Sequence, residues 1–237
     1  LQTAEQEQRE LEMLRRDLVT WVGHDLRTPL TSLRAVVEAL ADGVVEDPAT
    51  VHRYLQTARL HVRSLSDLLD DLSDVAQIDT GGMRLDRHRG SIRDLISDTL
   101  TSFSARAARE EVSLEGSTEP GVDPVSIDSQ KIERVLSNLL DNAIRHTPPG
   151  GVVHVNASAA GDEVRVEVSD TGEGIEAENL SRVFGRFYRG EEDRRRGASG
   201  SGLGLSIAKG FVEAHGGHVG IESEVGEGTT VWFTLPR

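Results

Sequence analysis

Residues 51–76 carry an unbroken heptad repeat of apolar side chains, and this pattern limits the fold more than any other feature of the chain. The repeat consists of Val51, Leu55, Ala58, Val62, Leu65, Leu69, Leu72 and Ala76. Alternating steps of four and three residues place all of them on one stripe of an α-helix. A similar stripe precedes it, made of Leu11, Leu14, Leu18, Val22, Leu26, Leu30, Leu33, Val37 and Leu40. The first third of the chain is therefore predicted to form two long amphipathic helices.

The residues between the two stripes predict that these helices form an antiparallel hairpin. Gly43 is typical of a helix end, and Asp47-Pro48 is typical of an N-cap followed by the first helical residue. Two helices alone cannot cover both apolar stripes well, whereas a dimer can bury them in a four-helix bundle. The alternative is a hairpin that packs against the rest of its own chain. We predict the dimer.

Glycine usage divides the chain into a helical part and a mixed part. Five of the 24 glycines lie within residues 1–90, and the other 19 lie beyond residue 115. Helical periodicity recurs at 92–108, 132–144 and 203–215, and strand-like alternation occurs at 153–155, 164–168, 219–221 and 231–235. Residues 171–202 read as a long loop. We predict a helical hairpin over residues 1–80, a linker over 81–90, and a two-layer α/β sandwich with mostly antiparallel strands over 91–237.

Composition excludes several classes of function. The 26 basic and 40 acidic residues give a formal net charge of −14, which argues against a nucleic-acid-binding protein, because such domains are basic. The chain has no cysteine, so disulfides, thiol catalysis and zinc fingers are excluded. The only lysines, Lys131 and Lys209, do not follow a glycine as a Walker A loop requires. No apolar run reaches the ~20 residues of a spanning helix, so we expect any membrane anchor to lie outside this chain.

Asp170 ends a strand pattern and begins the glycine-rich segment 170–174. Alternation places its carboxylate on the same face as Val164, Val166 and Val168, toward the core. A carboxylate there is costly without a hydrogen-bond donor. The amino group of adenine would supply one, because an ionised Asp only accepts hydrogen bonds. The alternative is an ordinary turn, since Asp-Thr-Gly-x-Gly is also favourable loop sequence.

Two further patterns suit the phosphates and metal ion of a nucleotide. Gly200, Gly202 and Gly204 precede a predicted helix, where glycine lets backbone amides approach a phosphate and the helix N-terminus adds positive potential. A flexible loop is the alternative. Asn138 and Asn142 lie four residues apart on the polar side of another predicted helix. Their amide oxygens are ligands of the kind that Mg²⁺ prefers, whereas a solvated helix face is the alternative.

His24 lies within the first apolar stripe but is predicted to point away from it. It is two residues from both Val22 and Leu26, which is about 200° around a helix. Thr28 follows one turn later on the same outward face. Pro29 removes a helical hydrogen bond and predicts a bend beside the histidine. These features favour a functional histidine over an incidental surface one.

Taken in order, these segments resemble the motifs of the sensor histidine kinases. The segments are 24–30 (H-box), 138–144 (N-box), 170–174 (G1 box), 184–189 (F-box), 200–205 (G2 box) and a final Gly-Glu-Gly-Thr-Thr at 226–230. Their order and spacing also fit, and the resemblance covers residues 10–237. It implies a dimerisation and histidine-phosphotransfer hairpin followed by an ATP-binding domain of the Bergerat (GHKL) type.

The resemblance also implies roles for individual residues. His24 would be the phosphoacceptor, Asp25 its base, and Thr28 the residue that orients water for a phosphatase reaction. The implied ATP-binding residues are Asn138, Asn142, Arg145, His146, Asp170, Gly172, Gly174, Phe184, Arg186, Arg189, Gly200, Gly202, Leu203, Gly204 and Thr229, with Mg²⁺ held by Asn138 and Asn142. Phe184 and Phe187 would anchor a mobile lid. The family often has Lys-Tyr where this chain has Arg145-His146, and the lid stretch 191–196 departs from the family in being heavily charged.

The expected activity is ATP-dependent autophosphorylation of His24, followed by transfer to an aspartate of a response-regulator receiver domain. The chain would act as a homodimer and as the cytoplasmic portion of a membrane protein whose sensor region lies outside it. One alternative is a Bergerat-fold ATPase without a phosphoenzyme, which would have no use for His24. The other is a nucleotide-binding scaffold without activity, against which the presence of His24, Asn142 and Asp170 argues.

Overall fold

The computed structural model describes residues 23, 26–190 and 201–237. Three expected site residues, His24, Asp25 and Gly200, therefore lie outside the described part of the chain. The chain divides into two compact units, Leu1–Ser73 and Asp74–Arg237. The first unit contains the hairpin, and the second contains the α/β domain together with the end of the second hairpin helix.

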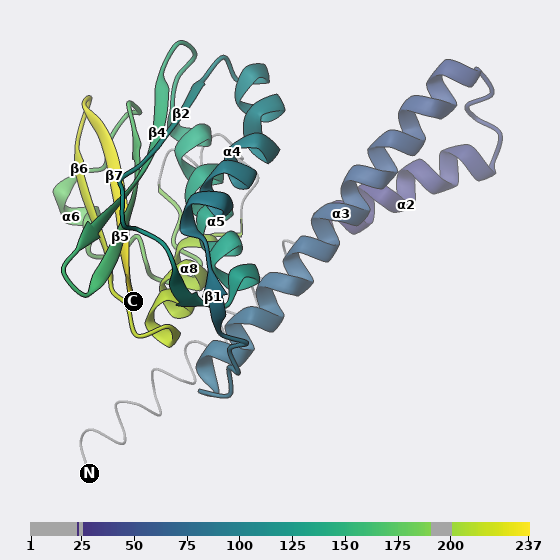
Figure 1. The fold of residues 1–237 in the computed structure, drawn as a ribbon. Helices are drawn as coiled ribbons and strands as arrows, with labels where there is room; N and C mark the ends of the chain where they lie inside the picture. Colours follow the sequence, from purple (N-terminus) through teal and green to yellow (C-terminus); the bar gives the residue numbers. More distant parts are fainter. Residues whose placement is uncertain (1–22, 24–25, 191–200) are drawn as a thin grey trace. The chain divides into compact units, whose positions relative to one another are not determined.

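The hairpin consists of α2 (Arg27–Ala41) and α3 (Pro48–Asp79), as Figure 1 shows. Gly43 follows the end of α2 in the left-handed conformation, with φ +68°. The Asp47 carboxylate accepts a hydrogen bond of 2.9 Å from the Thr50 backbone and caps α3, so both predicted helix boundaries are confirmed. Pro29 lies in the first turn of α2, where its missing N–H removes no helical hydrogen bond. None of the described helices is apolar enough over sufficient length to cross a membrane.

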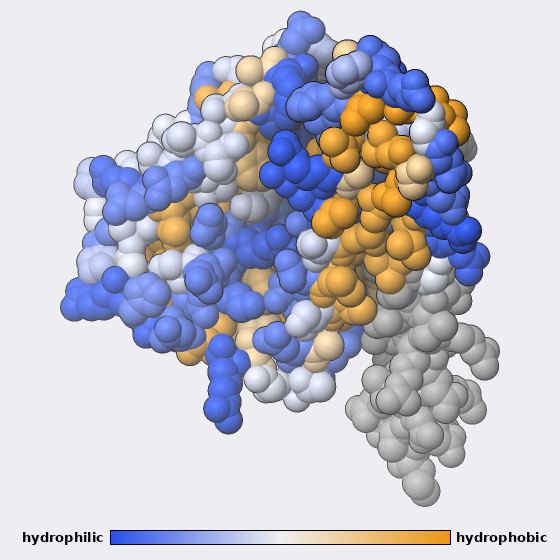
Figure 2. Space-filling model, turned by 90° about the vertical axis from the view of Figure 1, so that its right-hand side faces the viewer, coloured by the Kyte–Doolittle hydropathy of each residue, from blue (hydrophilic) through white to orange (hydrophobic). Residues whose placement is uncertain are grey.

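Apolar side chains gather into a band on one face of the molecule (Figure 2). All but one of the exposed large hydrophobic residues in the described chain belong to α2, α3 and the loop between them. Six of them follow two series with a spacing of seven residues: Leu30, Val37 and Val44, and then Leu55, Val62 and Leu69, with exposed fractions of 49–75%. Seam residues between them, such as Ala58 and Leu65, are half-buried. One apolar residue per heptad is therefore left uncovered along each series.

The second unit is a two-layer α/β sandwich, as predicted. Its elements are β1 (His88–Gly90), α4 (Ile92–Arg109), β2 (Ser113–Thr118), β3 (Val125–Ile127), α5 (Ser129–His146), β4 (Val152–Ala160), β5 (Glu163–Asp170), α6 (Ala177–Leu180), α8 (Gly204–Ala214), β6 (Val219–Glu224) and β7 (Gly228–Pro236). The main sheet has the order β2-β4-β5-β7-β6, and β2 is parallel to β4 whereas the other pairs are antiparallel. Helices α4, α5 and α8 cover one face of this sheet (Figure 1). The segment expected to be loop throughout contains the short α6.

The core lies between this sheet and the helices. Every second residue of β5 points into it, and Val164, Val166 and Val168 pair with the inward residues of β7 in register. All three are at most 2% exposed. The apolar stripe of α5 supplies the opposite wall, with Ile132, Val135, Leu136, Leu139, Leu140, Ala143 and Ile144 all buried. The strand residues that repeat every 2.0 positions and the helix residues that repeat every 3.6 positions therefore form the two sides of one core.

The last turns of α3 belong to the second unit. Val75 is 2% exposed. A Cβ atom at Gly210 of α8 would lie only 2.5 Å from Ile78, so the helices approach closely at this glycine. The Asp74 carboxylate is 3.1 Å from the Lys131 ammonium of α5. Residues 74–79 of α3 are therefore packed within the second unit.

Candidate nucleotide site

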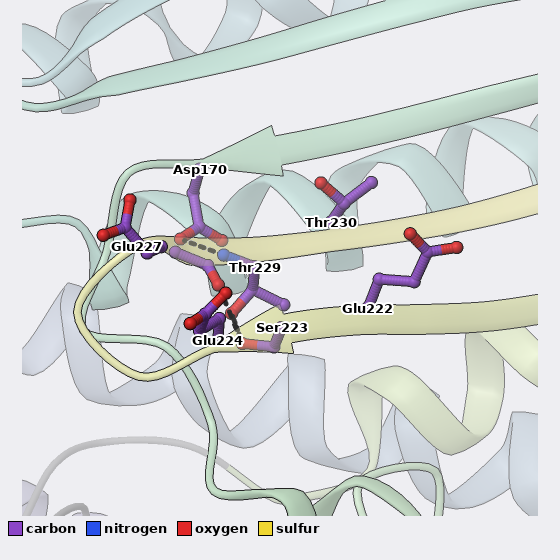
Figure 3. Close-up of a pocket in the computed structure, with 8 residues that line it drawn as sticks. Asp170, Glu222, Ser223, Glu224, Glu227, Thr229 and Thr230 are labelled. Carbon is purple, nitrogen blue, oxygen red and sulfur yellow. Dashed lines mark hydrogen bonds between the residues drawn. The ribbon is translucent and has the colours of Figure 1, made fainter.

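The site is centred on Asp170, the last residue of β5. Its Oδ1 accepts a backbone hydrogen bond from Gly172 at 2.9 Å. It accepts a second one from Thr229, on the neighbouring strand β7, at 3.2 Å (Figure 3). Burial raises the pKa of the Asp170 carboxyl, and the two backbone hydrogen bonds oppose this shift. Its Oδ2 accepts no hydrogen bond from any residue that the structure describes. One carboxylate oxygen is therefore held in place and the other is available to a ligand that donates.

A cavity of 350 Å³ opens beside this carboxylate at the turn between β6 and β7 (Figure 3). Its lining consists of Asp170, Glu222, Ser223, Glu224, Glu227, Gly228, Thr229 and Thr230. Four of these eight residues carry carboxylates, which would repel a triphosphate at close range. The cavity therefore suits the uncharged, donor-bearing base of a nucleotide and not its phosphate end.

Three glycines allow the chain to close around Asp170. A Cβ atom at Gly172 would lie 2.5 Å from the His146 carbonyl oxygen and 2.7 Å from the Asp170 carboxylate. Gly174 has φ +73°, and its Cβ would lie 2.1 Å from the carbonyl oxygen that ends β6. At Gly228, with φ +116°, a Cβ would lie 2.0 Å from the backbone oxygen of Asp170. Because carbon and oxygen cannot approach this closely, no other residue fits at these positions without moving the backbone.

Ser223 contributes to the site although no sequence pattern singled it out. Its hydroxyl accepts a hydrogen bond from the Ile175 backbone at 2.8 Å and donates to the Gly228 carbonyl at 2.8 Å. The Gly226 backbone also donates to the Glu173 carbonyl at 2.9 Å. These bonds fasten the glycine-rich loop after β5 to the β6–β7 turn. A lone serine before a glycine turn carries no periodic signal, so only the structure could identify this role.

The predicted N-box and G2 segments come together between α5 and α8. The Asn138 amide donates to the Gly204 carbonyl at 3.0 Å, at the point where α8 begins. Leu203, the residue before it, is fully buried. Asn142 is half-buried, and its amide makes no hydrogen bond with the described residues. The helix N-terminus and an available amide therefore lie on neighbouring elements, which is an arrangement suited to phosphate and to a hard cation.

The residues at the end of α5 are held by acidic partners. Arg145 forms an ion pair with Asp141 one turn earlier, and Arg106 of α4 pairs with the same carboxylate. His146 Nδ1 is 3.1 Å from the Glu173 carboxylate, in the loop that follows Asp170. His146 therefore borders the nucleotide site, whereas Arg145 has one carboxylate already bound to it.

The F-box turn packs against the glycine stretch that leads into α8. A Cβ at Gly202 would lie 2.9 Å from the Phe187 carbonyl carbon, and Phe187 itself has a left-handed backbone with φ +58°. Phe184 and Phe187 are both half-buried. Arg186 binds the Asp79 carboxylate at the end of α3, with Nη1 2.6 Å from Oδ2. Its expected contact with phosphate stays a prediction.

A divalent cation would find few protein ligands at this site. Within the described ranges, no group of three or more His, Cys, Asp or Glu side chains is placed to hold a metal ion. The amide oxygens of Asn138 and Asn142 accept no hydrogen bond from described residues and are available. This donor set fits Mg²⁺, which keeps several waters and takes further oxygens from nucleotide phosphates.

The structure also describes two other residues of the predicted site. Arg189 is half-buried, and Thr28 is exposed in the first turn of α2.

The fold and the site define a helical hairpin joined to an ATP-binding α/β sandwich. Residues 127–237 match the family described as histidine kinase-, DNA gyrase B-, and HSP90-like ATPase. Residues 14–81 match the His Kinase A (phospho-acceptor) domain. The chain belongs to the sensor histidine kinases and is the catalytic part of such a protein.

The chain is similar to individual relatives and solved structures along most of its length. The chain is 33% identical over 228 residues to the sensor protein SrrB of Staphylococcus aureus, a match that covers 96% of the chain and 39% of SrrB. The structure of full-length ShkA in complex with AMPPNP has a TM-score of 0.71 at 26% identity, over 93% of this chain and 45% of that one. The histidine kinase ThkA in complex with the response regulator protein TrrA has a TM-score of 0.69 at 23% identity, over 100% and 66%. The chain thus spans 39% of the length of SrrB.

Proposed function

We propose that this chain phosphorylates itself on His24 from ATP and then passes the phosphoryl group to an aspartate of a response regulator. The unprotonated ring nitrogen of His24 attacks the γ-phosphorus, a P–N bond forms, the bond to the bridging oxygen breaks, and ADP leaves. Above the ordinary histidine pKa of about 6.5 the neutral, nucleophilic imidazole dominates. Asp25 takes or orients the proton on the other ring nitrogen. The match of residues 14–81 to a phospho-acceptor domain supports this assignment.

The single observation that carries the ATP side of the proposal is the available Oδ2 of Asp170 beside an acidic cavity. Oδ1 is held by two backbone donors, so the carboxylate is oriented before any ligand binds. The adenine amino group donates to Oδ2, and the surrounding glutamates direct the triphosphate away from the cavity. The phosphates then extend toward Asn142 and the start of α8, where backbone N–H groups have no helical partner.

Asn138 and Asn142 would hold Mg²⁺ through their amide oxygens. When bound, the ion neutralises charge that develops on the phosphate oxygens during transfer. The Asn138 amide already donates through Nδ2 to the Gly204 carbonyl, which fixes its oxygen relative to the start of α8. The protein contributes this preset orientation.

Phosphoryl chemistry on the protein provides the direct test. With Mg²⁺ and radiolabelled ATP, the chain should gain phosphate that is stable to base and labile to acid. His24→Gln should abolish labelling and retain ATP binding, whereas His52→Gln should change neither. His52 is a matched control, because it is an exposed histidine on α3 whose ring forms a hydrogen bond with the neighbouring Gln56. ATP hydrolysis without labelling would support an ATPase, and ATP binding without either would support a scaffold; both results would refute the proposal.

We further propose that the hairpins of two chains pair. The series of exposed residues Leu55, Val62 and Leu69 repeats every seven residues, as in a coiled-coil seam. Each is about half-exposed in the single chain, and a second hairpin would cover them. The sensor region and its membrane attachment would lie outside this chain.

We also propose a phosphatase activity toward the phosphorylated regulator. Thr28 is exposed in the first turn of α2, four residues after His24, and a hydroxyl can both donate to and accept from a water. Thr28→Ala should slow dephosphorylation of the regulator by about tenfold or more and leave autophosphorylation unchanged. Thr31→Ala is the control, since Thr31 is exposed on the same helix. If both activities fall together, Thr28 has a structural role only.

A further inference from the structure

The end of α3 is joined to the F-box turn by a bidentate ion pair. Arg186 Nη1 lies 2.6 Å from Asp79 Oδ2, and Nη2 pairs with Oδ1. The two side chains are only 24% and 29% exposed. A planar guanidinium that binds both oxygens of a carboxylate fixes orientation as well as distance. The pair therefore sets both the position and the direction of the turn that contains Arg186.

This turn is strained and is held by several separate contacts. Phe187 has φ +58°, a left-handed conformation that is strained for a residue other than glycine. The Gly185 backbone donates to the Arg182 carbonyl at 2.8 Å. The Arg182 guanidinium lies 5.3 Å from the centre of the Tyr188 ring. Strained backbone persists only where its surroundings determine it, and Asp79 supplies the ion pair among these restraints.

The strained F-box turn contacts the glycine stretch at the start of α8, which borders the nucleotide site. Gly202 approaches the turn so closely that a Cβ there would lie 2.9 Å from the Phe187 carbonyl carbon and 2.9 Å from the Tyr188 oxygen. Two residues later, the Gly204 carbonyl accepts the hydrogen bond from Asn138. An unbroken series of contacts therefore runs from Asp79 to the amide that borders the phosphate end of the site.

We propose that Asp79 is a positioning residue for nucleotide binding, acting through Arg186. Its carboxylate holds the F-box turn in the strained conformation that packs on Gly202 and thereby fixes the glycine stretch at the start of α8. The end of the hairpin helix is in this way part of the nucleotide site's framework, although Asp79 touches no nucleotide. The inference rests on the proposed function to the extent that the site takes ATP.

Isosteric removal of the charge tests the role of Asp79. In the whole chain, Asp79→Asn should weaken ATP binding, measured by titration calorimetry, by about twofold to fivefold, the range that an ion pair of this exposure supplies. Asp74→Asn is the matched control, because it removes an ion pair to Lys131 from the same segment of α3 but does not contact the F-box turn. Asp74→Asn should lower the melting temperature comparably and leave the ATP affinity unchanged.

Charge reversal separates an ion-pair role from general damage. The double variant Asp79→Arg with Arg186→Asp should bind ATP more tightly than Arg186→Asp alone, because both variants lack any contact of Arg186 with phosphate and only the double variant can form the ion pair again. The inference is overturned if Asp79→Asn binds ATP as tightly as, or more tightly than, the unaltered chain, or if the double variant binds ATP no more tightly than Arg186→Asp alone. If Asp79→Asn fails to melt cooperatively, the double variant alone decides. Failure of the unaltered chain to bind ATP would instead overturn the proposed function.

Discussion

His215 provides the sharpest test of how the α/β domain is held together. The ring is 2% exposed. Its Nε2 accepts a hydrogen bond of 3.0 Å from the Asp128 backbone N–H, and its Nδ1 donates to the Phe211 carbonyl at 2.7 Å. Both bonds are satisfied only when the ring is neutral with its proton on Nδ1. The histidine thus joins the end of α8 to the start of α5. Asn138 of α5 contacts the other end of α8, at Gly204.

His215→Ala should destabilise the α/β domain by about 3 kcal/mol. Each of the two hydrogen bonds contributes about 1 kcal/mol net, and the cavity left by the buried ring adds about 1 kcal/mol more. For a unit of this size, 1 kcal/mol corresponds to about 2–4 °C in melting temperature. The variant should therefore melt about 6–12 °C below the unaltered chain at pH 7.5.

The same structure predicts how this difference depends on pH. Burial lowers the pKa of the His215 imidazole below its ordinary value of 6.5, nearby Arg87 adds to the shift, and the hydrogen bond to Phe211 and the charge of Asp128 oppose it. Because the unfolded chain takes up this proton first, stability from the neutral ring is fully present above about pH 6.5 and is lost as the pH falls below it. The loss is at most about 1.4 kcal/mol per pH unit, and the alanine variant lacks it.

Thermal melts followed by circular dichroism at pH 7.5 and pH 5.5 measure both effects. His218→Ala is the matched control, since this exposed side chain lies three residues further on. It should melt like the unaltered chain at both values. The reasoning is refuted if His215→Ala melts within about 2 °C of the unaltered chain at pH 7.5, or if the gap between them does not narrow at pH 5.5.

Two further predictions concern packing at the nucleotide site and between chains. Gly172→Ala places a Cβ 2.5 Å from a backbone oxygen and should weaken ATP binding by about tenfold or more, whereas Gly190→Ala, with nothing within 4 Å, should bind normally in the same calorimetric titration. Val62→Glu introduces a charge into the predicted dimer seam and should weaken dimerisation by about tenfold or more, as seen by light scattering. Val225→Glu changes an exposed valine on the β6–β7 turn and should leave the mass unchanged; equal masses for both variants would contradict the seam.

Periodicity in the sequence predicted most of the fold because the elements bury one face each. The heptad at 51–76 lies within α3, and the alternating valines of β5 are core residues. The two-stranded sheet of β1 and β3 and the four-residue α6 were not predicted, because elements this short hold too few residues to show a period. The positions of these short elements are determined by the elements around them and not by a sequence pattern of their own.

The sequence predicted a site residue correctly where its residue type is rarely found in that position for structural reasons alone. An aspartate at the core side of a strand end required a donor, and the structure supplies two donors for one oxygen of Asp170. The pairing of Arg186 with Asp79 joins residues 107 positions apart, and no local pattern encodes such a contact. Ser223 was not predicted for the same reason, since its two backbone partners are brought to it by the approach of separate loops.

The place of β7 in the sheet makes completion of the fold and completion of the nucleotide pocket a single event. β7 lies between β5 and β6, although it follows both in the chain. Until it is inserted, β5 and β6 each expose an unpaired edge, which is the feature that recruits other strands into aggregates. The same insertion delivers the Thr229 amide to Asp170. A nascent or proteolytically clipped chain that lacks β7 therefore cannot be rescued by nucleotide, and ATP can stabilise only molecules that have already finished folding.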